Sequence, residues 1–243
     1  MSAVMHSDTV VWQDVECGGY TADLPLWTEL ADTARAPLLE LGCGCGRVAL
    51  HLAQLGYGVS GIDNDQELVE ELRRRSATAG IEVRAERADG STFALTERFG
   101  LILAPMQLLQ LLPGPARRAD CLSRIAAHLR PGGMAAIALV DDFASGIPSS
   151  PPVPDVRELD GWVYSSLPLG VIDEAGELVV ERLRQKVSPG GRLEDVRDSV
   201  RLQKLSAAEL EEEAQAAGLR PAGRRLIEAS EMHAGSTVVL LAA

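Results

Sequence analysis

Short apolar runs alternate with amphipathic stretches in the part of the chain that follows residue 36. Four of the apolar runs have the length and the flanking glycines of buried strands; they are residues 37–41, 58–62, 101–104 and 134–140. In residues 81–85 apolar residues alternate with charged ones, as on a half-exposed strand. Helical periodicity marks three of the stretches between them; these are residues 47–55, 65–80 and 116–129. Such an alternation of strands and helices predicts a parallel sheet that is covered by helices on both faces.

The pattern changes after residue 146. Residues 147–155 hold four prolines, which predict a loop. Residues 177–187 and 192–202 have the character of strands, and the turn Ser-Pro-Gly-Gly joins them, so we expect a long antiparallel hairpin. A capping box of Ser206 and Glu209 begins a helix over residues 206–217. Two final strands are predicted at residues 224–229 and 236–241.

These elements predict a doubly wound α/β fold with a mostly parallel, seven-stranded sheet and an antiparallel insertion. The first 36 residues hold one or two helices and are expected to form an N-terminal helical cap. Residues 37–145 and 205–243 are expected to form the α/β domain, and residues 146–204 an antiparallel lid. A lid over the strand ends would enclose a pocket for a small molecule.

The balance of charge argues against an anionic partner. The formal net charge of the 243 residues is −12, and basic clusters are limited to residues 73–75 and 224–225. We interpret the first cluster as a complement to the dipole at the end of an acidic helix. The composition therefore speaks against nucleic acid and against an anionic membrane surface as partners.

Cysteine usage and the lack of targeting signals indicate an intracellular chain. Two of the four cysteines, Cys43 and Cys45, lie inside a glycine-rich loop, where a disulfide framework is not expected. The N-terminus has no signal-peptide pattern and no apolar run is long enough to span a bilayer. We expect a cytoplasmic protein. Metal binding is not expected, because only Cys17 could add a third thiol ligand.

The strongest chemical signal is the run Glu-Leu-Gly-Cys-Gly-Cys-Gly-Arg at residues 40–47. It follows a predicted strand and opens a helix. Glycines allow a sharp turn and a close approach of the backbone to a ligand, and the helix N-terminus offers free N–H groups to an anion. A dinucleotide fingerprint needs a third glycine where Arg47 stands, or, in the other register, at Ala49. The first register fails, and the second fails only in part because alanine is a permitted variant.

Two acidic residues follow at informative positions. Asp63 ends the second predicted strand, 21 residues after Gly42, where a carboxylate can bind ribose hydroxyl groups. Asp89 precedes Gly90 directly after the third strand, where a carboxylate can accept a hydrogen bond from an adenine amino group. An ordinary Asp-Gly turn is the alternative explanation of that second pair.

In this order, the motifs between residues 37 and 140 resemble the class I S-adenosylmethionine-dependent methyltransferases of the small-molecule type. The resemblance implies that Glu40 is the acidic residue that opens the glycine motif. Gly42 and Gly44 would lie against the methionine part of the cofactor, and Asp63 would bind its ribose.

The resemblance extends to the adenine side of the cofactor. Asn64 would line the adenine, Asp89 and Gly90 would lie at its edge, and the carbonyl of Ala104 would lie near the cofactor's amino group. The chain departs from the family at Cys45, where Thr or Ser is frequent, and a thiol is the weaker hydrogen-bond partner.

The expected reaction is an in-line transfer of the methyl group of S-adenosylmethionine to N or O of a small-molecule acceptor. Positioning alone contributes about 7–11 kcal/mol in favourable cases, so a dedicated catalytic residue is not required. The candidates for contact with the acceptor, or for a base, are Tyr20, Gln107, Asp141, Tyr164 and His233.

Two other function classes stay open at this point. One is an NAD(P)-dependent oxidoreductase, against which Arg47 and the pair Asp89-Gly90 both argue. The other is a non-catalytic cofactor-binding or scaffold protein with the same fold, since fold alone does not decide function. An exposed hairpin could also pair with a second copy of the chain, so a homodimer is expected. The acceptor and the pathway follow no pattern in the sequence.

Overall fold

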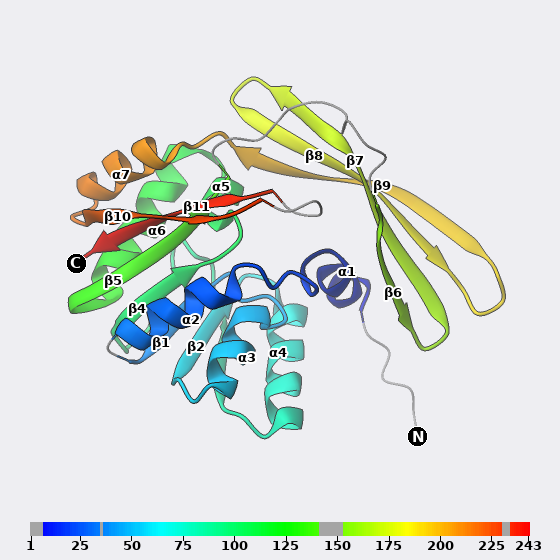
Figure 1. Cartoon of the computed structure of the whole chain (residues 1–243), viewed down its shortest axis with the longest axis horizontal. Coiled ribbons are helices and arrows are strands. Elements are labelled where there is room, and N and C mark those ends of the chain that lie inside the picture. The colour runs from blue at the N-terminus through cyan, green and yellow to red at the C-terminus, as the bar shows by residue number, and fades with distance from the viewer. Residues whose placement is uncertain (1–6, 35, 141–152, 230–233) are drawn as a thin grey trace. The chain divides into compact units, whose positions relative to one another are not determined.

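A computed structural model describes residues 7–34, 36–140, 153–229 and 234–243 of the chain (Figure 1). The chain divides into two compact units. One consists of Tyr20–Asp141 and Leu205–Ala243, and the other of Met1–Gly19 and Asp142–Lys204. The predicted cap at residues 1–36 is therefore divided between the two units, with one helix in each. That the antiparallel unit serves as a lid stays a prediction.

The larger unit is built on a seven-stranded sheet with the strand order β10-β11-β5-β4-β1-β2-β3. The strands are β1 (Leu38–Leu41), β2 (Val59–Asp63), β3 (Val83–Arg87), β4 (Phe99–Ala104), β5 (Leu129–Leu139), β10 (Arg220–Ile227) and β11 (Ser236–Ala242). The first five run parallel to one another, whereas β11 is antiparallel to both β5 and β10. The predicted doubly wound, mostly parallel sheet is confirmed.

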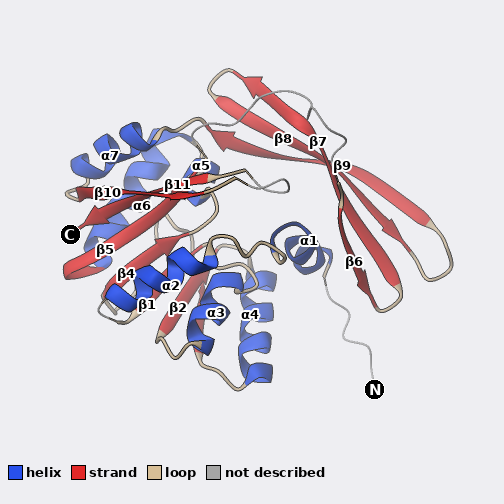
Figure 2. Cartoon of the chain, in the orientation of Figure 1, coloured by secondary structure: helices blue, strands red, loops and turns tan. Residues whose placement is uncertain are grey.

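Helices cover both faces of this sheet (Figure 2). One face packs against α2 (Leu24–Thr33), α3 (Arg47–Gln54) and α4 (Gln66–Ala79). The other packs against α5 (Leu108–Leu111), α6 (Gly114–His128) and α7 (Ala207–Ala216). Alternate residues of β1 point to opposite faces, so Leu38 joins one core and Leu39 the other.

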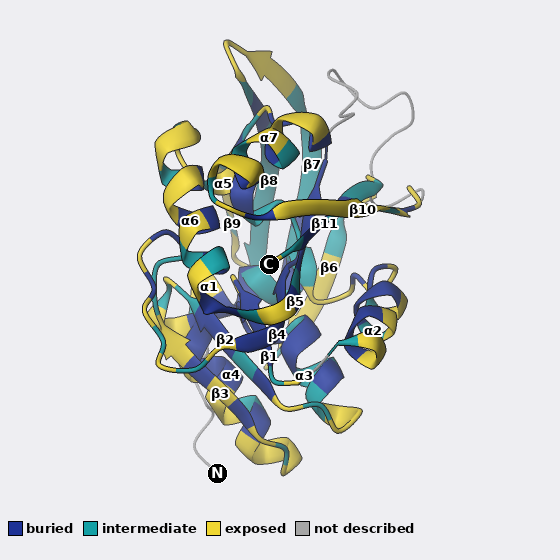
Figure 3. Ribbon diagram, turned by 90° about the vertical axis from the view of Figure 1, so that its left-hand side faces the viewer, coloured by how far each residue is buried: buried dark blue, intermediate teal, exposed yellow. Residues whose placement is uncertain are grey.

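Burial is deepest in the middle of the sheet. All six residues of β4 are buried, and the central strands are dark blue in Figure 3 while the outer sides of α6 and α7 are yellow. A parallel strand that is covered on both faces must be apolar throughout, which is the pattern that made β4 predictable. The described residues include no helix that has both the length and the apolar surface of a bilayer-crossing segment.

The smaller unit is an antiparallel sheet with the strand order β6-β7-β8-β9 and one helix, α1 (Asp8–Cys17). The strands are β6 (Asp155–Leu159), β7 (Trp162–Glu174), β8 (Glu177–Val187) and β9 (Leu193–Gln203). The pairing of β8 with β9 confirms the predicted hairpin. β6 was not expected as a strand.

Two further details correct the sequence analysis. Arg73, Arg74 and Arg75 lie in the middle of α4 rather than in its last turn, so they do not complement the helix dipole there. Instead Arg74 and Arg75 both donate to the buried carboxylate of Glu71, and Arg73 donates to the carbonyl oxygen of Ala85. β5 begins at Leu129 rather than at the predicted residue 134, so Pro131, Gly132 and Gly133 lie inside the strand.

Candidate cofactor site

The glycine-rich run forms a tight loop between β1 and α3. Three of its glycines have positive φ, namely +67° at Gly42, +51° at Gly44 and +92° at Gly46. A Cβ atom at Gly46 would lie 2.2 Å from Cδ1 of Leu72, and one at Gly42 would lie 2.9 Å from Cδ1 of Leu108. At Gly42 and Gly46 a side chain is therefore excluded by both conformation and space, so glycine is required for this tight turn.

Asp63, the last residue of β2, ties this loop to the neighbouring strand. Its Oδ2 atom accepts a hydrogen bond from the Gly44 N–H at 2.9 Å, and its Oδ1 atom accepts one from the Asp65 N–H at 3.0 Å. β1 and β2 are parallel neighbours, so their carboxyl ends lie at the same edge of the sheet. Asn64 follows there, and its carbonyl oxygen accepts a hydrogen bond from Nε of Arg87 at 3.1 Å.

Glu40 has an unusual environment for an acidic residue. Its side chain lies in β1, the residue is only 3% exposed, and the N–H of Ala49 in the first turn of α3 donates to its carboxyl group. Among the described side chains, its Oε2 atom is the buried oxygen that has no hydrogen-bond partner. Burial raises the pKa of Glu40 to about 8, although the nearby Arg47 guanidinium opposes the shift. An unsatisfied buried acceptor is costly, so this oxygen calls for a donor from a bound group.

Asp89 and Gly90 follow β3. Oδ1 of Asp89 accepts hydrogen bonds from the N–H and the Oγ–H of Ser91, and Oδ2 accepts one from Nη2 of Arg117. The Ser91 donors, together with the Arg117 guanidinium, hold the pKa of Asp89 below its ordinary value. Ala104 lies at the end of β4 and is fully buried.

A buried ion pair, which sequence reasoning missed, holds the first helix of this unit beside the glycine loop. Arg47 donates to both carboxylate oxygens of Asp23, at 2.6 and 2.7 Å, and to the carbonyl oxygen of Tyr20 at 2.8 Å. Its guanidinium also lies 5.0 Å from the centre of the Tyr20 ring, and Nε1 of Trp27 donates to Asp23. Arg47 lies 24 residues from Asp23 and 27 from Tyr20, so no local pattern joins them.

The carboxyl ends of β4 and β5 are joined by a second unexpected contact. Met106 and Gln107 have φ of +50° and +43°, which is rare for residues with a side chain. They lead into α5, whose Gln110 is fully buried. Its amide donates to the carbonyl oxygen of Val140 at 2.8 Å and accepts from the Val140 N–H at 2.9 Å. Backbone strain of this kind is concentrated at functional sites.

The candidate catalytic residues are distributed as follows. Tyr20 is buried beside Arg47, and Gln107 follows β4 at the same edge of the sheet as the cofactor motif. Tyr164 belongs to the smaller unit, where it lies on β7 and its ring packs edge-on against Trp12 at 5.5 Å. Asp141 and His233 lie outside the described residues. The roles of all five in catalysis stay predictions.

Two other features bear on the chemistry. A surface pocket of about 380 Å³ is lined by Pro37, Gly58 and Ile81, among others, at the amino ends of the strands and so away from the cofactor motif. Within the described ranges no group of three or more His, Cys, Asp or Glu side chains could hold a metal ion. The Cys43 thiol is buried, and burial raises its pKa.

Comparison with known proteins matches part of the chain to a methyltransferase domain. Residues 38–133 match the family model described as a methyltransferase domain. A hemagglutinin 1 of Eikenella corrodens is 33% identical over 106 residues, which are 44% of this chain and 35% of that protein. A ubiquinone biosynthesis O-methyltransferase of Methylobacterium sp. strain 4-46 is 29% identical over 185 residues, covering 74% of this chain and 67% of the relative.

Solved structures show a shared fold. The sugar N-methyltransferase KedS8 from a Streptoalloteichus species superimposes with a TM-score of 0.73 and 19% identity, and the match covers 98% of this chain and 94% of KedS8. That degree of identity establishes a common fold. The chain spans about a third to a half of the length of the first curated relatives that it matches. The predicted resemblance and the predicted fold class are confirmed.

Proposed function

We propose that this chain, whose residues 38–133 match a methyltransferase domain, transfers a methyl group from S-adenosylmethionine to N or O of a small-molecule acceptor. The observation that carries the proposal is the unsatisfied Oε2 atom of Glu40. Glu40 lies near the end of β1, beside the glycine loop whose Gly44 N–H donates to Asp63. A ligand with a hydrogen-bond donor next to an anionic group fits this combination.

The residues of this edge match the parts of the cofactor one by one. The tight turn at Gly42 and Gly44 suits the methionine part, and the carboxyl of Glu40 offers an acceptor to an amine or to a water held by it. Asp63 is placed at a strand end that suits ribose hydroxyl groups, and Asp89 is an acceptor for an adenine amino group. A nucleoside with a charged amino-acid tail carries hydrogen-bond donors for each of these three carboxyl groups.

When bound, S-adenosylmethionine supplies a methyl group on a positively charged sulfonium, which is an activated leaving group. The task of the protein is then to position the acceptor and to exclude water. The strained turn at Met106 and Gln107 and the clamp of Gln110 on Val140 fix the ends of β4 and β5, where we place the acceptor. A hydroxyl acceptor needs a base to remove its proton, whereas a neutral amine is nucleophilic without one.

The acceptor that we propose is an amino or hydroxyl group on a small polar molecule, such as a sugar. Relatives act on both kinds of atom, since one is named as an O-methyltransferase and one as a sugar N-methyltransferase. The net charge of −12 favours the approach of a cationic amine over that of an anion. The expected homodimer and the expected cytoplasmic location remain predictions.

Calorimetric titration tests the cofactor assignment. The wild-type chain is titrated with S-adenosylmethionine, S-adenosylhomocysteine and NAD, next to Asp63→Asn and the matched control Asp65→Asn. Asp65 caps α4 two residues farther on, and asparagine is an equally good cap. We expect both adenosyl ligands to bind, with at least about tenfold loss in Asp63→Asn and none in the control.

The outcome of that titration separates the function classes. Binding of NAD alone would establish the oxidoreductase alternative and exclude the methyltransferase. Binding of the adenosyl ligands without transfer to any member of a panel of amino sugars, hydroxylated aromatic compounds and small amines would support a cofactor-binding protein without catalysis. Transfer of a labelled methyl group to an amino sugar would establish both the reaction and the acceptor class.

A further inference from the structure

Arg117 reaches from α6 to the carboxylate that is placed for adenine. Its Nη2 atom donates to Oδ2 of Asp89 at 2.6 Å, across 28 residues of sequence. The two side chains are 39% and 36% exposed, so the pair lies at an accessible position rather than in the core. No motif of the family covers Arg117, and a solvent-accessible ion pair on its own adds little to stability. Its value must therefore lie elsewhere.

The hydrogen bonds around Asp89 leave one specific vacancy. Oδ1 accepts two bonds from Ser91, at 2.8 Å from N and 2.6 Å from Oγ, and Oδ2 accepts the single bond from Arg117. A carboxylate oxygen accepts two hydrogen bonds, so Oδ2 retains one position for a donor. An ionised carboxylate only accepts hydrogen bonds, and the Ser91 and Arg117 donors lower the pKa of Asp89 further below its ordinary value.

We propose that Arg117 is a positioning residue that orients the Asp89 carboxylate toward position 6 of the purine and so strengthens the preference of the site for a 6-aminopurine over a 6-oxopurine. The inference rests on the proposed function. A 6-amino group donates to the open position on Oδ2, whereas a 6-oxo group places a second acceptor against it. Sites built on a specific donor–acceptor pair reject the analogue that leaves a polar group unpaired.

Two ligands and three proteins test this proposal. S-adenosylhomocysteine and S-inosylhomocysteine, which differ at position 6 of the purine and in the proton that the 6-oxo form carries on N1, are titrated by calorimetry into wild type, Arg117→Met and Arg192→Met. Methionine keeps most of the aliphatic stem of arginine. Arg192 lies next to the β8–β9 turn, its side chain is 79% exposed, and its substitution removes the same charge. The melting temperature of each variant is measured to confirm folding.

We expect the wild type to prefer the adenosyl ligand by at least about tenfold, which corresponds to one hydrogen bond to a charged group. In Arg117→Met the preference should fall by a factor of about three to ten, through weaker adenosyl binding, while inosyl binding changes by less than about twofold. Arg192→Met should match the wild type. A fourth protein, Asp89→Asn, should narrow or reverse the preference, because its amide can donate to a 6-oxo group.

The failures are distinguishable. If the wild type binds neither nucleoside, the proposed function itself is wrong. If the wild type binds and discriminates but Arg117→Met is identical to Arg192→Met, the cofactor assignment stands and the role of Arg117 is overturned. Tighter adenosyl binding in Arg117→Met would also overturn it, since it would show that the arginine competes with the purine instead of orienting its partner.

Discussion

Different interactions stabilise the interior of each of the two units. In the larger unit every residue of β4 is buried, and its two hydrophobic cores consist almost wholly of Leu, Val, Ile and Ala. In the smaller unit most residues of β8 are only half-buried, and the acids of α1 pair with bases of the sheet. Those pairs are Asp8 with Lys186, Asp14 with Arg157 and Glu16 with Arg184.

This difference explains where the chemistry can be found in the sequence. A deeply buried sheet is rigid enough to present a loop at a fixed place, so the cofactor motif sits at its edge as a short, readable string. A sheet held by ion pairs tolerates change at most of its positions, because exposed pairs contribute only about 0–1 kcal/mol each. The acceptor specificity of such a unit leaves no motif.

The largest expected effect is a cavity in the larger unit. Leu101 lies in β4 and is fully buried, so Leu101→Ala should lower the free energy of unfolding by about 3–5 kcal/mol. The matched change in the smaller unit is Val196→Ala in β9, at a side chain that is 57% exposed, where the expected loss is within about 0.5 kcal/mol. Urea denaturation measures both. Equal losses would show that the two units do not differ in the way described.

The same contrast sets how much of the structure follows from sequence. The strands β1, β2, β4 and β5 were predictable because buried parallel strands must be apolar. β6 was missed because the run Asp-Val-Arg-Glu-Leu at 155–159 is half charged and follows a proline-rich loop, and its residues are largely exposed. Polar strands outside a core carry little period-2 signal.

The candidate site divides along similar lines. Glu40, Gly42, Gly44, Asp63 and Asp89 could be named because each stands at a strand end within a short motif. The groups that orient them could not: Arg47 reaches Asp23 across 24 residues, and Arg117 reaches Asp89 across 28. Only the topology of the sheet and its helices brings such pairs together, so they become visible with the fold.

The second prediction concerns Glu40 of the larger unit, whose buried Oε2 atom has no hydrogen-bond partner among the described residues. The folded pKa of Glu40 is raised to about 8, above the ordinary value of 4.5. The folded state therefore binds the extra proton, and stability falls as pH rises from 4.5 through 8. Glu40→Gln lacks this loss, so it should exceed the wild type by a few kcal/mol near pH 9 and match it near pH 5.

The same variant should bind S-adenosylhomocysteine less tightly, because an amide replaces the carboxyl group whose Oε2 atom has no partner among the described residues. Stability gained together with affinity lost is the expected signature of a group retained for function. Urea curves at the two pH values, with calorimetry alongside, measure it. A variant that is destabilised at both pH values would show that Glu40 serves only the fold.

The third prediction weakens the smaller unit. Glu16 accepts two hydrogen bonds from Arg184, at 2.7 and 2.8 Å, and one from Ser166 at 2.8 Å. Burial would raise the pKa of Glu16, but these bonds outweigh it and lower the pKa below 4.5. Glu16→Gln should cost about 1–3 kcal/mol at pH 7.

The sign of the pH dependence follows from that lowered pKa. The stability that Glu16 contributes is present above pH 4.5 and is lost as pH falls through the lower folded value, so the difference between variant and wild type should shrink between pH 7 and pH 3.5. Glu194→Gln, at a 40% exposed side chain of the same sheet, is the control. A constant difference at all pH values would point to packing rather than charge.

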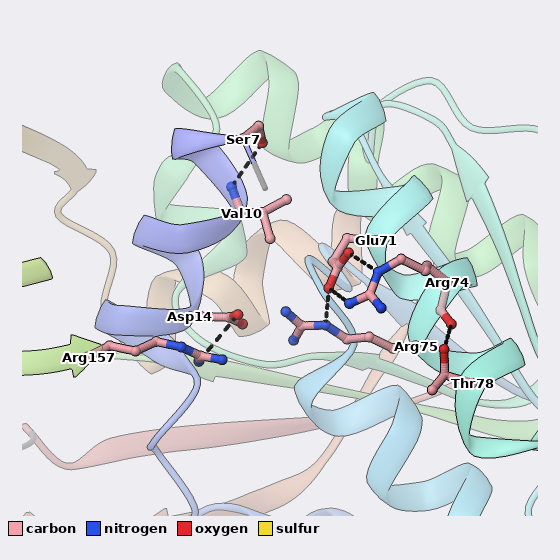
Figure 4. Close-up of polar contacts among 8 residues, drawn as sticks. All are labelled: Ser7, Val10, Asp14, Glu71, Arg74, Arg75, Thr78 and Arg157. Carbon is pink, nitrogen blue, oxygen red and sulfur yellow. Dashed lines mark hydrogen bonds and ion pairs between the residues drawn. The ribbon is translucent and has the colours of Figure 1, made fainter. Parts of the chain in front are cut away.

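The smallest effect is expected from a change to an ion-pair cluster in the larger unit, of the kind that is common in the smaller unit. Glu71 of α4 accepts hydrogen bonds from Arg74 and Arg75, while in the smaller unit Asp14 pairs with Arg157 (Figure 4). Burial would raise the pKa of Glu71, but the two arginines lower it to about 2. Because Arg74 is 46% exposed, Glu71→Gln should cost only about 0.5–1 kcal/mol at pH 7, and less below pH 4.5.

Glu82→Gln, at a side chain that is 83% exposed, should cost nothing measurable. If Glu71→Gln instead costs as much as Glu16→Gln, then ion pairs hold the larger unit together as well, and the contrast between the two units lies in their cores alone.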